Sequence, residues 1–324
     1  MKFFVTGGAG FIGSNFIDML LSNGHEVTAY DNLSTGQIKF LANASKSKNF
    51  NFVKGDLLDE DNLTKSMINV DFVVHFAANA DIRHGLESPK RDIEQNIIAT
   101  FNLLESMRKL KIKKIIFASS AAVLGEPQIF PTPEDIPIPK QTSLYGASKM
   151  ACENLLSAYC EGFNFEAYVY RFVSVLGKRY PHGHVFDFVR KIKEDASILE
   201  VLGDGTQRKS YMHIDDCIEA INLTAIVKKT AEKLKTKIEI YNLGNPDYIS
   251  VEDSAKLIIS KMGFDTKIKY TGGKQGWVGD NPFVFLDIKK IQKHGWKPNK
   301  TIIESLVDTV NWLKDNDWIF EKRR

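Results

Sequence analysis

Tyr145 and Lys149 are the residues whose types and spacing point most directly to chemistry. They are four positions apart, so on a helix their side chains share one face. An ammonium beside a phenol favours the phenolate and lowers the pKa of the tyrosine from its usual value of about 10. The pair then becomes a proton-transfer group at neutral pH. The same spacing is common on helix surfaces, so the neighbouring segments must decide between the two interpretations.

A glycine-rich segment near the N-terminus indicates nucleotide binding. Gly7, Gly10 and Gly13 lie between an expected strand over residues 3–5 and an expected apolar helix that follows. Gly7 permits a tight turn, Gly10 lets the backbone approach a pyrophosphate, and Gly13 lets helix and strand pack closely. The helix N-terminus offers N–H groups to the phosphates. A glycine-rich turn without a ligand is the alternative.

Acidic residues follow the next two expected strands, over residues 26–31 and 51–57. Asp31 lies 18 residues after Gly13, where a carboxylate accepts hydrogen bonds from an adenosine ribose. Because it repels a 2′-phosphate, it favours NAD over NADP, although Asp31 could instead cap the strand end. Asp56 either accepts from the adenine amino group or forms a turn.

Strand and helix patterns alternate through the first half of the chain. Further strands are expected over 71–78, 114–120 and 165–171, with an amphipathic helix over 92–110 whose apolar face carries Ile93, Ile97, Phe101 and Leu104. His75 is interpreted as a packed structural histidine. The alternation predicts an α/β fold, a Rossmann-type doubly wound parallel sheet with a smaller mixed α/β C-terminal substrate domain. The expected domains are 1–172 and 173–324, with segments around 211–245 returning to the first.

The second half is less regular and richer in basic residues. The segment from Gly177 to His184 is expected to be a loop, and helices are expected over 185–195 and 301–314, the latter with an apolar face that includes Ile303. The basic loops form either a lid over an anionic substrate or a solvated surface.

Composition excludes several functions. The 324 residues contain 43 Lys and Arg against 40 Asp and Glu, a net charge of +3, which makes no case for a nucleic-acid or membrane partner. Three scattered cysteines indicate a reducing compartment and no metal site. Neither a signal peptide nor an apolar run of about 20 residues is expected, so the sequence predicts a soluble cytoplasmic protein.

Taken together, the motifs resemble the extended short-chain dehydrogenase/reductases, and most closely the UDP-glucose 4-epimerase-like enzymes. The resemblance covers nearly the whole chain and rests on Gly7-x-x-Gly10-x-x-Gly13, Asp31-Asn32-Leu33, Gly55-Asp56, His75-x-Ala77-Ala78, Ser119-Ser120-Ala121, Tyr145-x-x-x-Lys149, Gly203-Asp204-Gly205-x-Gln207 and His213-x-Asp215-Asp216.

The resemblance implies an enzyme that acts on a nucleotide-activated sugar with NAD and pairs as a homodimer through a helical bundle. Tyr145 would remove a proton from a sugar hydroxyl, usually at C4, and Lys149 would hold the nicotinamide ribose and lower the pKa of Tyr145. Ser120 would hydrogen-bond the sugar oxygen as a 4-keto intermediate forms, and Asn96 would support the lysine.

The resemblance also assigns binding residues. The NAD contacts it implies are Gly7, Gly10, Phe11, Ile12, Gly13, Asp31, Asn32, Ser34, Thr35, Gly36, Asp56, Leu57, Ala77, Ala78, Asn96, Tyr145 and Lys149. The substrate contacts it implies are Ser120, Ser174, Arg179, Arg208, Lys209 and Lys274, and the loop with Arg83 and His84 lies on the expected substrate path.

Departures from the family pattern narrow the reaction and leave the substrate open. Ala121 and Ala122 stand where related dehydratases carry the acid and base for water elimination, so epimerisation or oxidation fits better. Ser174 replaces a usual asparagine, and Lys209 replaces an arginine whose bidentate fork lysine cannot reproduce. The diphosphate site is therefore rebuilt, and a UDP-hexose is the first choice of substrate.

Several alternatives stay open. A dehydrogenase, a decarboxylase or another epimerase acting on a sugar nucleotide would use the same motifs. A non-catalytic NAD-binding regulator is a remote alternative, because such proteins tend to lose the tyrosine or the lysine, and both are present here.

Overall fold

The computed structural model describes residues 1–80, 82, 85, 87–137, 140–227, 237–277 and 279–321. The chain divides into two compact units. The first comprises Met1–Glu126, Pro137–Phe172 and Ala220–Tyr241, and the second comprises Pro127–Ile136, Val173–Glu219 and Asn242–Arg324. The segment that returns to the first unit, 220–241, lies within the range of 211–245 expected from the sequence, whereas residues 127–136 belong to the second unit and not to the first.

The first unit is built on a seven-stranded sheet with the order β11-β6-β5-β4-β1-β2-β3. Strands β1 to β6 pair in parallel, and the order reverses between β1 and β4, which is the doubly wound arrangement that the sequence predicts. The strands are β1 (Lys2–Thr6), β2 (Glu26–Asp31), β3 (Phe50–Lys54), β4 (Phe72–His75), β5 (Lys114–Ser120), β6 (Glu166–Phe172) and β11 (Ile238–Leu243).

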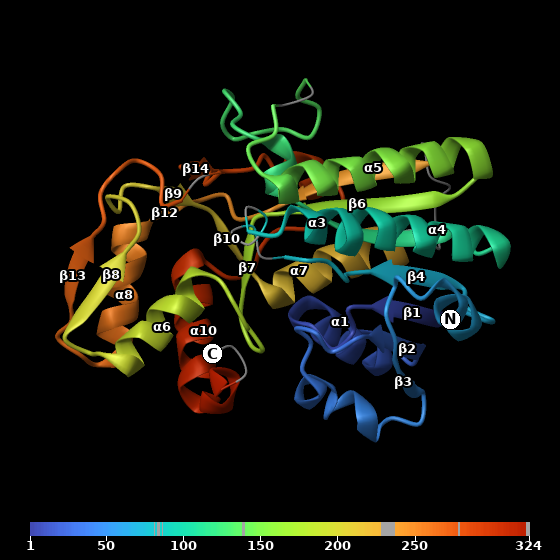
Figure 1. The fold of residues 1–324 in the computed structure, drawn as a ribbon, viewed down its shortest axis with the longest axis horizontal. Helices are drawn as coiled ribbons and strands as arrows, with labels where there is room; N and C mark the ends of the chain where they lie inside the picture. Colours follow the sequence, from blue (N-terminus) through green and yellow to red (C-terminus); the bar gives the residue numbers. More distant parts are fainter. Residues whose placement is uncertain are drawn as a thin grey trace. The chain divides into compact units, whose positions relative to one another are not determined.

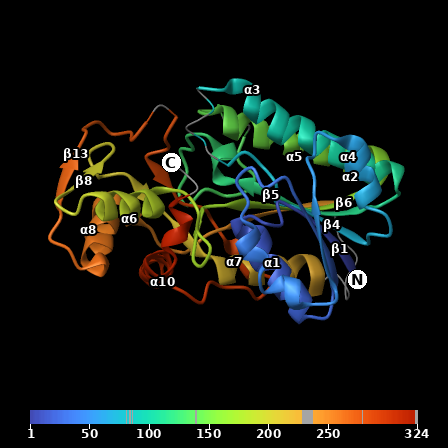
Figure 2. The same cartoon turned by 60° about the horizontal axis from the view of Figure 1, so that its bottom comes forward.

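Helices cover both faces of this sheet. The helices of the first unit include α1 (Phe11–Ser22), α2 (Glu60–Ser66), α3 (Pro89–Asp92), α4 (Ala99–Lys109) and α5 (Leu144–Phe163). Figures 1 and 2 show α2, α4 and α5 on one face and α1 on the other. Because the strands run in parallel, their carboxyl ends meet at one edge, where the loops after β1, β2, β4 and β5 lie.

A π-helical segment, Ile93–Ile98, interrupts the helix expected over residues 92–110. Its wider turn changes the register of the side chains that follow. Leu104 is buried and Ile97 packs against the core as expected, but Ile93 is 51% exposed and Phe101 is 43% exposed, so these two positions of the predicted apolar face are wrong. The buried face of α4 instead consists of Ala99, Thr100, Leu103, Leu104, Ser106 and Met107.

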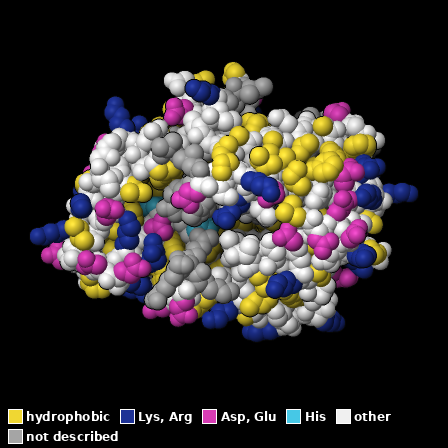
Figure 3. Space-filling view, in the orientation of Figure 1, with side chains coloured by type: hydrophobic (Ala, Val, Ile, Leu, Met, Phe, Trp, Pro, Cys, Tyr) yellow, Lys and Arg dark blue, Asp and Glu magenta, His cyan; other side chains and the backbone are white. Residues whose placement is uncertain are grey.

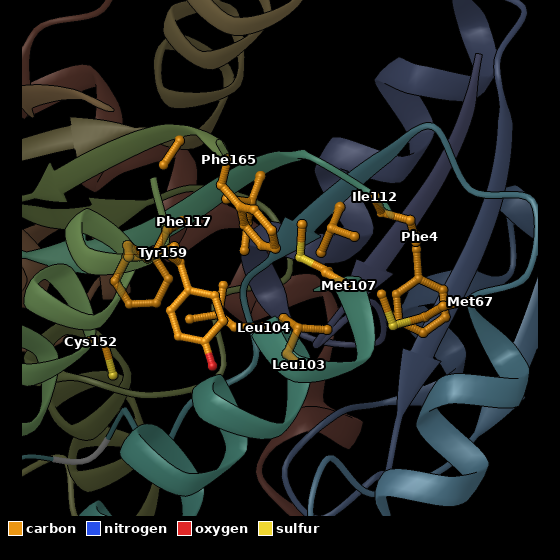
Figure 4. Packing of buried hydrophobic residues seen from close by; sticks show 14 of the residues in the cluster. Phe4, Met67, Leu103, Leu104, Met107, Ile112, Phe117, Cys152, Tyr159 and Phe165 are labelled. Carbon is orange, nitrogen blue, oxygen red and sulfur yellow. The ribbon is translucent and has the colours of Figure 1, made fainter. Parts of the chain in front are cut away.

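The core of the first unit fixes α4 and α5 against the sheet. Figure 4 shows Leu103 and Met107 of α4 packing beside Phe117 of β5 and Tyr159 of α5. These side chains are at most 8% exposed. Burial of apolar surface at about 25 cal/mol per Å² is the main force that holds both helices in place. The position of α5 matters for function because α5 carries Tyr145 and Lys149.

The second unit is a smaller mixed α/β assembly, as the sequence predicts. Its helices include α6 (His184–Glu194), α8 (Val251–Met262), α9 (Lys289–Gln292) and α10 (Ile302–Asp315), and α7 (Ile214–Ile221) follows β10. Short strands pair as β7 (Ser174–Leu176) with β10 (Tyr211–His213), β8 (Ile198–Val201) with β13 (Lys267–Tyr270), and β9 (Arg208–Lys209) with both β12 (Ile249–Ser250) and β14 (Phe283–Val284).

Two details of the second unit differ from the sequence-based expectations. His184 opens α6 instead of ending a loop, and Ile303 of α10 is 48% exposed, outside the buried face that includes Leu306 and Val310. Thr301 and Glu304 form a capping box that fixes where α10 begins. Within the described residues, no helix combines the length and apolar character needed to cross a membrane.

The core packing can be tested with Leu103→Ala. Leu103 is fully buried, so we expect this variant to lose about 2–5 kcal/mol of unfolding free energy in urea denaturation. The matched control is Ile68→Ala, at a side chain that is 61% exposed, and it is expected to cost less than about 1 kcal/mol. Equal losses in the two variants would contradict the described core.

Candidate active site

The glycine loop after β1 is closed by contacts that leave no room for side chains. Gly7 has a φ of +65°, and a Cβ there would lie 2.7 Å from the Ala77 nitrogen. A Cβ on Gly13 would lie 2.2 Å from the Gly7 carbonyl oxygen. Helix α1 begins after Gly10 without a side-chain cap. The first N–H groups of a helix have no intrahelical acceptor, so this terminus fits the pyrophosphate of NAD.

Asp31 holds this loop in place. Its carboxylate is 7% exposed and accepts hydrogen bonds from the backbone N–H groups of Ala9, at 2.9 Å, and Leu33, at 2.8 Å. Burial raises the pKa of Asp31, and the two backbone hydrogen bonds oppose that shift. Asp31 therefore caps the end of β2, which is the alternative role that the sequence left open for it. Each carboxylate oxygen has a second lone pair, so hydrogen bonds from ribose hydroxyls remain compatible.

Asp56 forms a turn, which is one of the two roles that the sequence left open for it. Its Oδ1 accepts from the Leu58 N–H at 2.9 Å, and its Oδ2 accepts from the Asn32 side chain at 2.9 Å. This bond joins the loops after β2 and β3. Of the other expected cofactor contacts nearby, Ser34 and Thr35 are exposed, whereas Gly36 and Leu57 are buried.

The end of β4 carries small residues beside a neutral histidine. Ala77 donates its N–H to Thr6 Oγ1 at 3.3 Å, and Ala78 follows it. His75 lies between Thr6, with Nδ1 2.7 Å from Oγ1, and Thr100, with Nε2 3.0 Å from Oγ1. Burial lowers the pKa of His75 to about 3, so the ring is uncharged at neutral pH. Its interpretation as a structural histidine is confirmed.

The three predicted catalytic residues come together at the carboxyl end of β5. Helix α5 begins at Leu144, and Tyr145 and Lys149 are 8% and 3% exposed. Lys149 Nζ donates to the Ala118 carbonyl oxygen at 2.9 Å. Ser120, the last residue of β5, accepts from the Ala122 N–H at 3.1 Å and is hydrogen-bonded to the Tyr145 phenol.

The pKa values of this pair differ from the sequence-based expectation. Burial raises the pKa of Tyr145 to about 12, against the opposing effect of its hydrogen bond with Ser120. Burial also lowers the pKa of Lys149 to about 8. The net shift of the Tyr145 pKa is therefore opposite to the lowering expected from the sequence, because the cost of burying a phenolate dominates.

Asn96 is 2% exposed and lies on the π-helical segment. Its side chain donates to Ser148 Oγ at 2.8 Å and accepts from the Asn79 N–H at 2.8 Å. Since Ser148 precedes Lys149 in α5, the support that Asn96 gives to the lysine is indirect.

A buried ion pair behind the site was missed by the sequence analysis. Glu153 is bound by Arg171 of β6 through Nε–Oε1 at 3.0 Å and Nη2–Oε2 at 2.7 Å, and Ser119 Oγ donates to Oε1 at 2.5 Å. Both charged side chains are at most 6% exposed. The sequence contains a pattern that could have identified Glu153, because this residue continues the four-residue spacing of Tyr145 and Lys149 on one helix face.

In the second unit, Arg208 and Lys209 point to opposite faces of β9, as adjacent strand residues must. Lys209 Nζ pairs with the buried Asp280, 2.8 Å from Oδ1. The Arg208 guanidinium lies over the rings of Phe283, at 4.1 Å from the centroid, and Tyr248, at 5.3 Å. The structure therefore does not bring the side chains of Arg208 and Lys209, two of the substrate contacts that the resemblance implies, together.

The remaining expected substrate contacts are scattered over the second unit. Ser174 opens β7 and Lys274 lies between β13 and β14, both exposed, and Arg179 is partly buried with a φ of +69°. Arg83 and His84 lie outside the described residues.

A glycine loop at the switch point of the sheet and a hydrogen-bonded Tyr145–Ser120 pair beside a buried lysine define an NAD-binding enzyme of the short-chain dehydrogenase/reductase class. Residues 3–244 match the model of the NAD dependent epimerase/dehydratase family. The chain belongs to this family.

Named relatives cover nearly the whole chain. This chain is 32% identical over 327 residues to the UDP-glucuronate 4-epimerase of Thermodesulfobacterium geofontis, and the match covers 97% of this chain and 96% of the relative. Its structure matches a UDP-galactose 4-epimerase with a TM-score of 0.87 and 34% identity, over 98% of this chain and 100% of the other. It also matches the Thermotoga maritima UDP-glucose 4-epimerase with UDP-glucose, with a TM-score of 0.85 and 30% identity, over 98% and 99% of the two chains.

The buried ion pair gives a testable coupling. Arg171→Met leaves the Glu153 carboxylate buried without its partner, and we expect a loss of about 3–5 kcal/mol in unfolding free energy measured with urea. The double variant Arg171→Met/Glu153→Leu removes both charges and is expected to be more stable than Arg171→Met alone. A double variant that loses the sum of the two single losses would show that the pair is not coupled.

Proposed function

We propose that this protein is an NAD-dependent 4-epimerase that acts on a nucleotide-activated sugar, with a UDP-hexose as the first choice. The observation that carries this proposal is the arrangement of Tyr145, Lys149 and Ser120 at the same sheet edge as the glycine loop. The whole-length similarity to 4-epimerases that act on UDP-sugars supports it.

The residues of the first unit suit NAD. The uncapped N-terminus of α1 is expected to hold the pyrophosphate, Asp31 the adenosine ribose, and Lys149 the nicotinamide ribose. When bound, NAD would supply the hydride acceptor in its oxidised form and the hydride donor in its reduced form.

The protein itself handles the proton. The Tyr145 phenolate oxygen takes the proton of the C4 hydroxyl, while the Ser120 hydroxyl holds the same sugar oxygen. Because burial gives Tyr145 a high pKa, its phenolate is a strong base once formed, and the same phenol can return the proton at the end of the cycle. The hydrogen bond with Ser120 favours the phenolate, and positive charge brought close to the phenol would favour it further.

Epimerisation is favoured over water elimination by the residues after Ser120. Ala121 and Ala122 follow it directly, and neither can donate or accept a proton through its side chain. Ser174, Arg179, Arg208, Lys209 and Lys274 are proposed substrate contacts. The divergence of Arg208 and Lys209 implies that at most one of the two reaches any single substrate group.

The deciding experiment offers purified protein a panel of UDP-, GDP-, dTDP- and CDP-sugars and identifies the products by NMR. A 4-epimerase returns its hydride, so absorbance at 340 nm should show no accumulated NADH. Accumulating NADH would instead favour a dehydrogenase or decarboxylase of the same family. A protein that binds NAD and converts none of the sugars would favour a regulator.

Tyr145→Phe tests the assignment of the proton-transfer group. We expect kcat to fall by about 10²–10⁴-fold because the variant keeps the ring and loses the acid/base group. Tyr159→Phe is the matched control, since Tyr159 lies on the same helix but hydrogen-bonds Glu105 at 2.6 Å. Undiminished turnover in Tyr145→Phe would exclude the mechanism proposed here.

A homodimer is the proposed assembly. Figure 3 shows apolar side chains gathered on the face that carries α4 and α5. The exposed residues there are Ile93, Ile98, Phe101, Leu144 and Phe163, each 41–51% exposed. A patch of this kind is typical of a protein–protein interface, and a second copy would cover it.

A cytoplasmic location is also proposed, because Cys152, Cys160 and Cys217 are buried free thiols, which suits a reducing compartment.

Phe101→Glu tests the dimer. Placing a charge in the centre of an apolar interface is expected to weaken association by at least about tenfold, so light scattering during size-exclusion chromatography should show monomers at micromolar concentration. The control is Ile303→Glu, at a similarly exposed residue of α10, which should remain dimeric. A wild-type protein that is already monomeric would refute the assembly.

A further inference from the structure

Asp92 is a buried carboxylate that the mechanism above does not use. It ends α3 and is 1% exposed. Its Oδ1 accepts from the Asn79 side chain at 2.9 Å and from the Asn96 side chain at 3.4 Å. Among the described residues, its Oδ2 has no hydrogen-bond partner. Burial of a charged group with an unused oxygen is costly, so a nearby positive charge must compensate for it.

A chain of hydrogen bonds runs from Asp92 to the catalytic helix. Asn96 is held on one side by the Asn79 N–H, at 2.8 Å, and donates on the other to Ser148 Oγ, also at 2.8 Å. Ser148 Oγ donates in turn to the Tyr145 carbonyl oxygen at 2.8 Å. An ionised carboxylate can only accept, so Asp92 fixes which way both amide groups face and hence the direction of the chain.

Several ionisable groups face Lys149, and their charges differ. Glu153 already binds Arg171 with both oxygens. Burial lowers the pKa of His75 to about 3 and raises the pKa of the Cys152 thiol, so both are neutral near pH 7. Glu153 and Asp92 therefore both supply negative charge to Lys149, and Asp92 is the one of the two that is not bound by an arginine.

The influence between Asp92 and Lys149 is mutual. Burial raises the pKa of Asp92, and the hydrogen bond from Asn79 and the positive charges of Arg91 and Lys149 oppose this. Burial lowers the pKa of Lys149, and Cys152, Glu153 and Asp92 oppose this. The same carboxylate also raises the pKa of Tyr145, to which Cys152 contributes in the same direction.

We propose that Asp92 is a positioning residue for the reaction: its carboxylate orients the Asn79–Asn96–Ser148 chain against α5 and keeps Lys149 in its charged form. This inference deepens the proposed function and rests on it for its catalytic meaning. The orienting part depends on the acceptor oxygen, which Asn retains. The electrostatic part depends on the charge, which Asn lacks. Asp92→Asn therefore separates the two parts.

The sign of the electrostatic effect is fixed by the charges. Loss of the negative charge at Asp92 makes the ammonium of Lys149 less favourable, so its pKa falls further. It also makes the phenolate of Tyr145 more favourable, so the pKa of the tyrosine falls as well. Lys149 must be protonated and Tyr145 ionised for turnover, so both limbs of the pH profile of kcat should move to lower pH.

The test measures Lys149 directly, without using activity. Protein labelled with 13C-lysine is titrated by NMR over about pH 6 to 11, a range that spans the usual lysine pKa. The Lys149 signal is assigned by its loss in Lys149→Gln. In Asp92→Asn we expect its titration midpoint to lie lower than in the wild type by about half a pH unit or more. Asp61→Asn, which removes an exposed carboxylate from α2, is the matched control and should leave the midpoint unchanged.

A second readout separates positioning from simple stability. The pH profile of kcat should move to lower pH in Asp92→Asn by a similar amount, whereas a merely structural role would lower kcat at every pH and leave the profile in place. If Asp92→Asn fails to fold, Asp92→Ser, which is also neutral and keeps an acceptor, is used for both measurements. An unchanged Lys149 midpoint in the neutral variant overturns the proposal. The NMR titration of Lys149 does not depend on whether the wild type epimerises a sugar. A failure of the proposed role of Asp92 can therefore be distinguished from a failure of the proposed 4-epimerase function.

Discussion

The docking of α5 on β5 is the constraint on which the rest of the site depends. Three consecutive residues of the strand meet three residues of one helix face: Ala118 accepts from Lys149, Ser119 donates to Glu153, and Ser120 hydrogen-bonds Tyr145. The three helix residues are four positions apart, so they lie on one face of α5, which is the face turned to the strand. Burial of the apolar surface between them holds this match, and Arg171 on the next strand secures it from behind.

Burial is the largest influence on the protonation of Tyr145 and Lys149. It drives the pKa of Tyr145 up and the pKa of Lys149 down, in both cases toward the uncharged form. The proposed mechanism needs a phenolate and an ammonium, and burial opposes both of these charged forms. The polar contacts around Lys149 and Tyr145 then have a common purpose, which is to make the charged forms tolerable in a place from which water is largely excluded.

Much of this could be predicted from the sequence because it rests on local patterns. The glycine loop, the strands that follow it and the Tyr145–Lys149 spacing each specify their geometry within a few residues. What could not be predicted depends on contacts distant in the chain or on the backbone register. The pKa of Tyr145 reflects total burial, Lys209 is committed to Asp280 71 positions away, and the π-helical turn has no sequence signature as simple as a glycine or a proline.

The π-helical segment Ile93–Ile98 has a consequence for how the molecule can change over time. One irregular turn directs Asn96 inward to the catalytic helix and leaves Ile93 and Ile98 on the outside, where a second copy is proposed to bind. Converting this turn to a regular helix by a one-residue deletion would rotate the side chains on both sides of it together. The inward position of Asn96 and the outward positions of Ile93 and Ile98 therefore depend on the same turn, and a change in that turn alters them together.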